Sequence, residues 1–141
     1  MSEIKISTEE IRYIALFEKE TGAAIQDCII DDDRIIYVVK AGDMGAAIGR
    51  GGDHINRVKK HVDKHIELVE YSDDPVVFIT NAFEPASVKA VNIINKNDKR
   101  LAYVDVPSSD KGLAIGRSGR NIEKVKMLAQ RHHDVTDVIL K

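Results

Sequence analysis

The sequence predicts an α+β protein built from two copies of one module, each with the order helix, strand, strand, helix, helix, strand. Two observations lead to this prediction. The segment from Gly45 to Lys59 matches the segment from Gly112 to Lys126 at an offset of 67 residues, with nine of fifteen positions identical, and such repeats mark repeated structural units. Helical and strand-like hydrophobic spacing also follow each other in the same order around both copies. We therefore expect an α/β sandwich with domains 1–72 and 73–141.

The first module begins with a clear helix signal. Ser7-Thr-Glu-Glu10 is a capping-box pattern, apolar residues follow at helical spacing, and Gly22 is a stop signal. Two β-rich runs around a polar turn predict a hairpin, and a helical turn, a glycine loop, a helix and an alternating strand follow. The predicted ranges are strand 24–30, turn 31–34, strand 35–39, helical turn 45–48, helix 53–65 and strand 65–71.

The second module repeats this order after a short junction at residues 71–75, where Asp-Pro is a turn or helix-start signal. Its glycine loop again lies between two helical segments. The predicted ranges are helix 76–82, strand 88–94, turn 95–98, strand 100–106, helix 119–132 and strand 135–140.

Composition limits the class of protein. Hydrophobic residues make up 43% of the 141 residues and charged residues 31%, which is typical of a soluble globular chain and too apolar for a disordered one. No apolar run approaches the roughly 18 residues that span a bilayer, and the N-terminus lacks the basic and apolar regions of a signal peptide. We therefore expect a cytoplasmic protein without a membrane partner, whose single cysteine, Cys28, is a buried apolar residue.

Charge is segregated along the chain, although the formal net charge is only -2. Residues 1–33 hold nine acids against three bases, residues 49–65 hold five bases against two acids, and residues 111–131 hold six bases against one acid. Local fields rather than net charge steer a polyanion. The two basic segments, which overlap the repeat, therefore favour a nucleic-acid partner.

The most informative motif is a glycine loop that occurs twice, as Ile48-Gly-Arg-Gly-Gly52 and Ile115-Gly-Arg-Ser-Gly119. One such loop is weak evidence, because a corner between two helices also needs glycine. Here both copies have the same place in the module, and each precedes a basic helix. Glycine allows a nucleic-acid backbone to approach the peptide, and N–H groups at the start of the next helix favour a phosphate oxygen.

The module with I-G-x-x-G-x-x-I at its centre resembles a type II KH domain. The segments Asp74-Pro-Val-Val-Phe-Ile-Thr-Asn-Ala-Phe-Glu-Pro-Ala-Ser-Val88 and Val104-Asp-Val-Pro-Ser-Ser-Asp-Lys-Gly-Leu-Ala-Ile-Gly-Arg-Ser-Gly-Arg-Asn-Ile122 resemble the KH pair of the NusA family of transcription factors. The bacterial family adds a polymerase-binding domain and an S1 domain, for which 141 residues leave no room, so the chain is similar to the short archaeal NusA-like proteins. The resemblance implies two tandem type II KH domains, each with a three-stranded sheet and helices on one face.

The resemblance also implies single-stranded RNA binding in transcription termination or antitermination on nascent RNA, with RNA polymerase as a protein partner. KH loops clamp about four nucleotides each. Because no Phe or Tyr lies in either loop or in the helix after it, we expect backbone clamping and charge, rather than aromatic stacking, to dominate RNA recognition. We also expect the protein to be a monomer. The residues expected to bind RNA are Ile48, Gly49, Arg50, Gly51, Gly52, Lys59, Ile115, Gly116, Arg117, Ser118, Gly119, Arg120 and Lys126.

Other chemistry finds little support in the sequence. His54, His61 and His65 are spaced seven and four residues apart, which puts His61 and His65 on one face of the predicted helix, but no third metal ligand accompanies them. Asp31-Asp-Asp33 is typical of a solvated hairpin tip. No nucleophile motif or Walker A ending is present, so we expect no enzyme activity, no metal and no cofactor.

Two alternatives to RNA binding in transcription stay open. A protein-interaction module would dock on RNA polymerase or a ribosome-related assembly through the acidic N-terminal helix. RNA binding in translation or RNA decay would share the mechanism and differ only in pathway. The intact glycine loops in both modules favour RNA binding over the interaction module.

Overall fold

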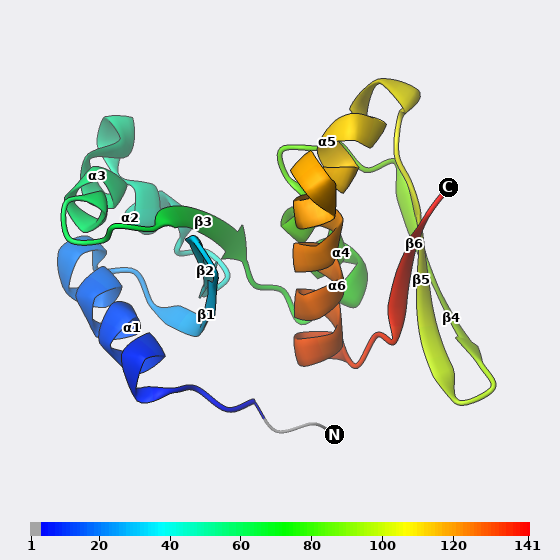
Figure 1. Cartoon of the computed structure of the whole chain (residues 1–141), viewed down its shortest axis with the longest axis horizontal. Helices are drawn as coiled ribbons and strands as arrows, with labels where there is room; N and C mark the ends of the chain where they lie inside the picture. Colours follow the sequence, from blue (N-terminus) through cyan, green and yellow to red (C-terminus); the bar gives the residue numbers. More distant parts are fainter. Residues whose placement is uncertain (1–3) are drawn as a thin grey trace. The chain divides into compact units, whose positions relative to one another are not determined.

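A computed structural model describes residues 4–141, so residues 1–3, which begin the predicted first domain and its acidic segment, lie outside the described residues. The chain divides into two compact units: Lys5–Ser72, the first unit, and Asp73–Lys141 together with Ile4, the second unit. Each has the order helix, strand, strand, helix, helix, strand, and in each the helices lie on one side of the sheet (Figure 1). The predicted fold class is therefore confirmed.

The first unit begins with α1 (Thr8–Thr21), whose ends match the sequence signals. Ser7 and Glu10 form the capping box, and Gly22 ends the helix in the left-handed conformation with φ 77°. The elements that follow are β1 (Ile25–Asp31), β2 (Arg34–Val39), α2 (Met44–Ile48), the 3-10 turn Arg50–Gly52, α3 (Asp53–Lys59) and β3 (His65–Glu70).

The first sheet has β2 at its centre, antiparallel to β1 and parallel to β3. All six residues of β2 are buried. Tyr37 from this strand shares one core with Phe17 from α1, Val58 from α3 and Cys28, which is fully buried. The Phe17 and Tyr37 rings lie 4.4 Å apart between centroids, and burial of a ring of this size contributes about 1.5–3 kcal/mol. This core fixes α1 and α3 on the sheet.

The second unit repeats the arrangement with β5 as the central strand, antiparallel to β4 and parallel to β6. Its helix α4 packs against α6. Its elements are α4 (Pro75–Phe83), β4 (Ala90–Lys96), β5 (Lys99–Asp105), the 3-10 turn Ser108–Asp110, α5 (Lys111–Ile115), the 3-10 turn Arg117–Gly119, α6 (Arg120–His133) and β6 (Asp137–Leu140).

The helix predicted over residues 53–65 is shorter than expected. It ends at Lys59, because the strand that follows must begin at His65 to pair with Arg34 of β2. Val62 leaves the helix and packs against the core. The corresponding helix of the second unit, α6, keeps fourteen residues against seven for α3.

Candidate nucleic-acid interface

Each glycine loop connects two helices at the same place in its unit. Gly49 caps the C-terminal end of α2, where its N–H donates to Gly45 O at 2.8 Å, and Gly116 caps α5, where its N–H donates to Gly112 O at 2.9 Å. The backbone angles φ and ψ are 76° and 172° at Gly49 and 79° and 170° at Gly116. The sequence repeat therefore produces the same turn twice.

The first glycine of each loop faces into the unit rather than outward. A Cβ added to Gly49 would lie 2.6 Å from His54 Cγ, and one added to Gly116 would lie 2.7 Å from the backbone nitrogen of Asn121. Its φ and ψ also belong to a region that is essentially restricted to glycine. Gly49 and Gly116 are thus needed for the packing of the loop itself, which differs from the expectation that these glycines make room for a ligand.

The tip of each loop is open. Gly51 has φ 62°, and nothing lies within 4 Å of where its Cβ would be. Ser118 holds the equivalent place in the second loop with φ 55°, a left-handed conformation that costs a residue with a side chain roughly 1–2 kcal/mol. Backbone strain of this kind occurs preferentially at functional sites. The tip, rather than the first glycine, is therefore where an extended ligand backbone has access.

The helices that follow the loops lack side-chain caps. Gly52 precedes α3 and Gly119 precedes α6, and neither has a side chain that accepts from the first turn. In contrast, Ser7 caps α1 and Asp74 caps α4. Because the first turn of a helix presents N–H donors without intrahelical partners, the fourteen-residue helix α6 offers such donors to an anion at the second loop, apart from the Arg120 N–H, which donates to Arg117 O.

Apolar side chains flank the loops on the side of the preceding helix. Ile48 is 40% exposed and Ile115 is 44% exposed, and Leu113 of α5 is 51% exposed. Ile55, which follows the first loop, packs instead against the core of the first unit, and Ile122 is half-buried. The isoleucines before the loops are therefore accessible to unpaired bases, as their expected role in RNA binding requires.

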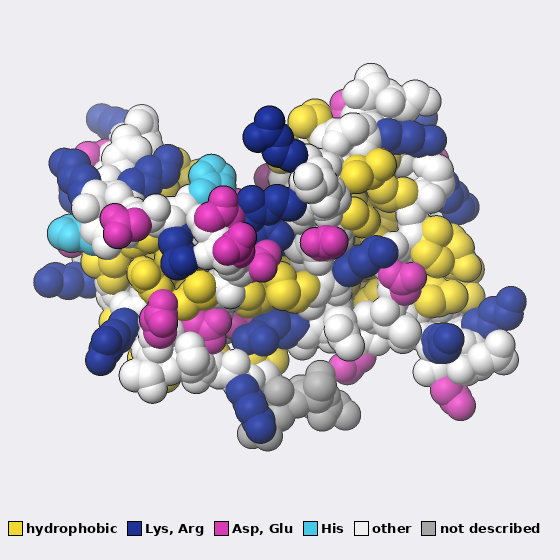
Figure 2. Space-filling view, in the orientation of Figure 1, with side chains coloured by type: hydrophobic (Ala, Val, Ile, Leu, Met, Phe, Trp, Pro, Cys, Tyr) yellow, Lys and Arg dark blue, Asp and Glu magenta, His cyan; other side chains and the backbone are white. Residues whose placement is uncertain are grey.

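The basic residues at the loops differ in how free they are. Arg50 and Arg117 lie exposed at the loop tips, Lys59 is exposed on α3, and no ion pair or hydrogen bond of these three side chains is found within residues 4–141. Figure 2 shows Lys and Arg side chains gathered at the upper left, where α2 and α3 of the first unit lie in Figure 1. Exposed guanidinium groups can pair with phosphate or stack on a base.

Four further cations have more restricted surroundings. Lys126 Nζ lies 3.4 Å from Asp137 Oδ1, with both side chains about half exposed, and Arg120 is half-buried. Lys124, one of the six bases in the basic segment 111–131, is buried. In the first unit Arg57 pairs with Asp53 at 3.3 Å and lies 3.9 Å from Glu20. Lys124 and Arg57 are therefore not free phosphate contacts.

The sequence interpretation missed the side chains that tie each loop to the helix before it. His54 Nδ1 donates to Ala46 O at 2.6 Å. Asn121 Nδ2 donates to Leu113 O at 3.3 Å and Ala114 O at 3.1 Å. Both residues lie two positions after the last loop glycine. The repeat aligns the two positions, but it does not indicate what their side chains bind.

Metal-binding chemistry finds no cluster in the described chain. Among residues 4–141 no group of three or more His, Cys, Asp or Glu side chains is placed to hold a metal ion. His61 and His65 do not share a helix face, because α3 ends at Lys59. Asp31 is held by Arg34 at 2.8 Å. The prediction that His61 and His65 lie on one helix face is therefore wrong.

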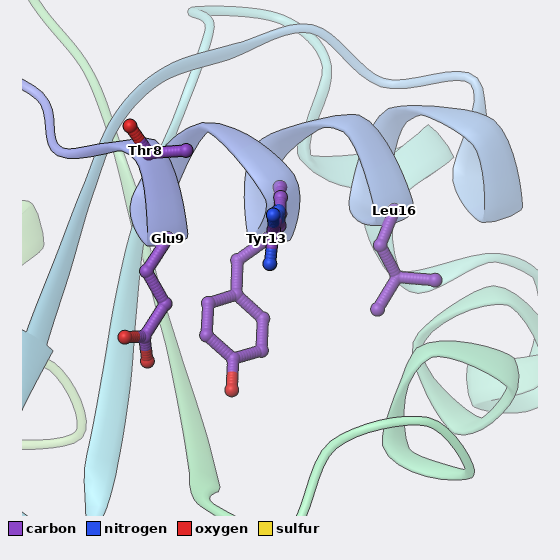
Figure 3. Close-up of a pocket in the computed structure, with 5 residues that line it drawn as sticks. Thr8, Glu9, Tyr13 and Leu16 are labelled. Atoms are coloured by element: carbon purple, nitrogen blue, oxygen red, sulfur yellow. The ribbon is translucent and has the colours of Figure 1, made fainter.

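A surface depression of about 560 Å³ lies along α1 and takes no residue from the loops. In Figure 3 the Glu9 and Tyr13 side chains project side by side from the helix, with Leu16 one turn further on. The depression is lined by Thr8, Glu9, Arg12, Tyr13 and Leu16, which include no hydrogen-bonded pair of nucleophile and base. Within residues 4–141, no helix has the length and apolar character needed to cross a membrane.

Comparison with known families matches both units. A family model described as a KH domain matches residues 10–82, and one described as the NusA-like second KH domain matches residues 75–139. Among solved structures, the one titled "Crystal structure of APE1850" superposes with a TM-score of 0.83 at 34% identity, covering 96% of this chain and 100% of that chain.

Curated relatives match over nearly the whole length. The "Probable transcription termination protein NusA" of Halobacterium salinarum is 45% identical over 137 residues, which cover 97% of this chain and 98% of the relative. The protein of the same name from Methanocaldococcus jannaschii is 33% identical over 138 residues, covering 98% of this chain and 75% of the relative.

Proposed function

Because the chain belongs to the archaeal NusA-like family of KH-domain proteins, we propose that it binds single-stranded RNA through the loops 49–52 and 116–119. One KH domain spans residues 1–72 and the other spans residues 73–141. The RNA is nascent transcript, and the protein acts on it as a termination or antitermination factor. The names of its relatives support this pathway.

The observation that carries the proposal is the repeated loop with an open tip, an exposed arginine and an uncapped helix behind it. The phosphate backbone approaches at Gly51 and Ser118, where the loop leaves space. Arg50 and Arg117 neutralise phosphate charge there. The N–H groups at the start of α6 add donors in the second unit. Each loop then holds about four nucleotides, as KH loops do.

The flanking residues complete the proposed interface. Ile48 and Ile115 offer aliphatic surface to unpaired bases, and Lys59 and Arg120 add charge on the helices behind the loops. Lys126 contributes by exchanging its ion pair with Asp137 for a phosphate. An exposed ion pair of this kind is worth at most about 1 kcal/mol, so RNA can compete for it.

The two loops differ in charge at one equivalent position. Asp53 follows the first loop, where it pairs with Arg57, whereas Arg120 follows the second loop. The carboxylate of Asp53 repels phosphate beside the first loop, and the guanidinium of Arg120 attracts it beside the second. We therefore expect the second loop to contribute more of the affinity.

The test is a titration of a fluorescent, unstructured RNA of about a dozen nucleotides. The loop variant carries Arg50→Asp, Gly51→Asp, Arg117→Asp and Ser118→Asp, which put four acids where phosphates are expected. The unmodified chain should bind with an affinity that falls as salt rises, and the folded loop variant should not bind. Equal binding by both would overturn the loop mechanism and favour the protein-interaction module.

A matched control separates loop chemistry from net charge. The hairpin tip between β4 and β5 is exposed and belongs to neither loop. Four substitutions there change the formal charge by the same amount as the loop variant, namely Asn95→Asp, Lys96→Asp, Asn97→Asp and Lys99→Asp. The hairpin variant should retain most of the RNA affinity, because local rather than total charge governs binding.

The pathway and the remaining properties need a separate measurement. We expect a cytoplasmic monomer without enzyme activity that associates with RNA polymerase. Affinity capture with the unmodified chain should recover RNA polymerase subunits. Recovery of ribosomal or exosome subunits instead would place the same RNA chemistry in translation or RNA decay.

A further inference from the structure

The residue two positions after each loop binds the same carbonyl in both units with a different side chain. His54 and Asn121 are equivalent at the offset of 67 residues, and so are Ala46 and Leu113. His54 Nδ1 donates to Ala46 O, and Asn121 Nδ2 donates to Leu113 O. The sequence differs while the bond is kept, which indicates that the bond itself is required.

The need for this bond follows from the length of the helices before the loops. α2 and α5 have five residues each, and the last four carbonyls of a helix lack intrahelical partners. Gly49 N and Gly116 N satisfy only the carbonyls of Gly45 and Gly112. A side-chain donor that follows the loop therefore bonds to a carbonyl that the short helix leaves unpaired. This bond links the helix before the loop to the helix after it.

The same two residues also pack against the first glycine of each loop. The ring of His54 lies against Gly49, and the backbone and Cβ of Asn121 lie against Gly116. Each loop is thus held by a hydrogen bond to the preceding helix and by contact with its own first glycine. Asn121 also reaches Phe83 O at 3.2 Å, which ties the second loop to α4.

We propose that His54 and Asn121 are the positioning residues of the two loops, and that they hold each loop in the conformation that receives the RNA backbone. This inference rests on the proposed RNA binding. Neither residue needs to touch RNA, because the effect comes from ordering the loop before the ligand arrives, which lowers the entropic cost of binding. The additional tie from Asn121 to α4 makes the second loop the better ordered of the two.

The experiment exchanges histidine and asparagine between the two positions, His54 and Asn121. The first loop is measured alone in chains whose second loop carries Arg117→Asp and Ser118→Asp, using the RNA titration described above. In that background His54→Ala should weaken binding by about 2–10-fold, the equivalent of one lost hydrogen bond. His54→Asn should restore the affinity to within about twofold, because asparagine makes the equivalent bond in the second loop.

The reciprocal set tests Asn121→Ala and Asn121→His with the first loop silenced by Arg50→Asp and Gly51→Asp. Asn56→Ala is the control for the first loop, since this exposed residue lies on the same turn and its side chain makes no hydrogen bond in the described chain. Amide hydrogen exchange in the absence of RNA should rise at residues 49–52 in His54→Ala and remain at the parent level in His54→Asn.

Each outcome decides one claim. An unmodified chain that binds no RNA overturns the proposed function and this inference with it. A parent that binds, with His54→Ala and Asn121→Ala binding equally well, overturns the positioning role alone. If an alanine variant does not fold, the exchanged variants decide. His54→Asn or Asn121→His that folds but keeps the weakened affinity would contradict the proposal.

Discussion

Substitution of the first loop glycine tests whether the loop conformation is set by packing. Gly49 has φ 76° and ψ 172°, a combination that costs other residues about 1–3 kcal/mol. An added Cβ would lie 2.6 Å from His54 Cγ and 2.8 Å from His54 N, and overpacking of this kind costs typically about 1–3 kcal/mol. Gly49→Ala should therefore lower the free energy of unfolding of the first unit by about 2–6 kcal/mol.

Gly51→Ser is the control in the same loop, at a glycine with another left-handed backbone conformation and open surroundings. Its φ is 62°, and nothing lies within 4 Å of the added Cβ. The equivalent position of the second loop already holds serine, Ser118, with φ 55°. The cost should therefore be limited to the left-handed backbone, roughly 1–2 kcal/mol.

The assay is amide hydrogen exchange of the buried strand β2, which reports the opening of the first unit itself. A global melting curve is less suitable, since two units need not unfold in one cooperative step. The slowest amides of β2 should exchange faster in Gly49→Ala than in Gly51→Ser. Equal acceleration in the two variants would refute the argument that Gly49 is required for packing against His54.

Three further predictions follow from individual contacts. Arg50→Ala and Arg117→Ala should each reduce the slope of log affinity against log salt by about 0.7, if each arginine neutralises one phosphate of a single strand, as titrations at several salt concentrations will reveal. Burial, followed by the charges of Cys28 and Tyr13, raises the pKa of Tyr37 above the ordinary value of 10. The unfolded chain then releases this proton first, so the free energy of unfolding should fall as pH rises above about 10, and Tyr37→Phe should remove that part of the loss in urea titrations. Ser7→Ala should cost about 0.5–2 kcal/mol through the lost cap of α1, measurable by hydrogen exchange in that helix.

Local signals predicted most of the fold. The capping box at Ser7 and the stop at Gly22 bound α1 as expected, because each depends only on nearby residues. The order of elements in both units also follows from hydrophobic spacing. The end of α3 could not be predicted this way, since it depends on the pairing of His65 with Arg34 across the sheet.

The repeat in the sequence identified the two candidate loops, but it did not indicate which contacts hold them in place. Ile48 and Ile115 are exposed, which is a condition of the RNA-binding role expected of them. The role of Asn121 depends on contacts with α5 and with Phe83, which is 38 residues away, and no local pattern contains that distance. The burial of Lys124 could be predicted from the sequence, because Lys124 lies four residues before the buried Leu128 and therefore on the same helix face.

The most direct test of the central claim is a map of the amides that respond to RNA. Isotope-labelled full-length chain would be titrated with the unstructured oligonucleotide, and backbone amide chemical shifts followed by NMR. We expect the largest changes in residues 49–52 and 116–119 and in the first turn of α6. Silent loops, with the changes concentrated along α1 between Thr8 and Leu16, would contradict binding through the glycine loops.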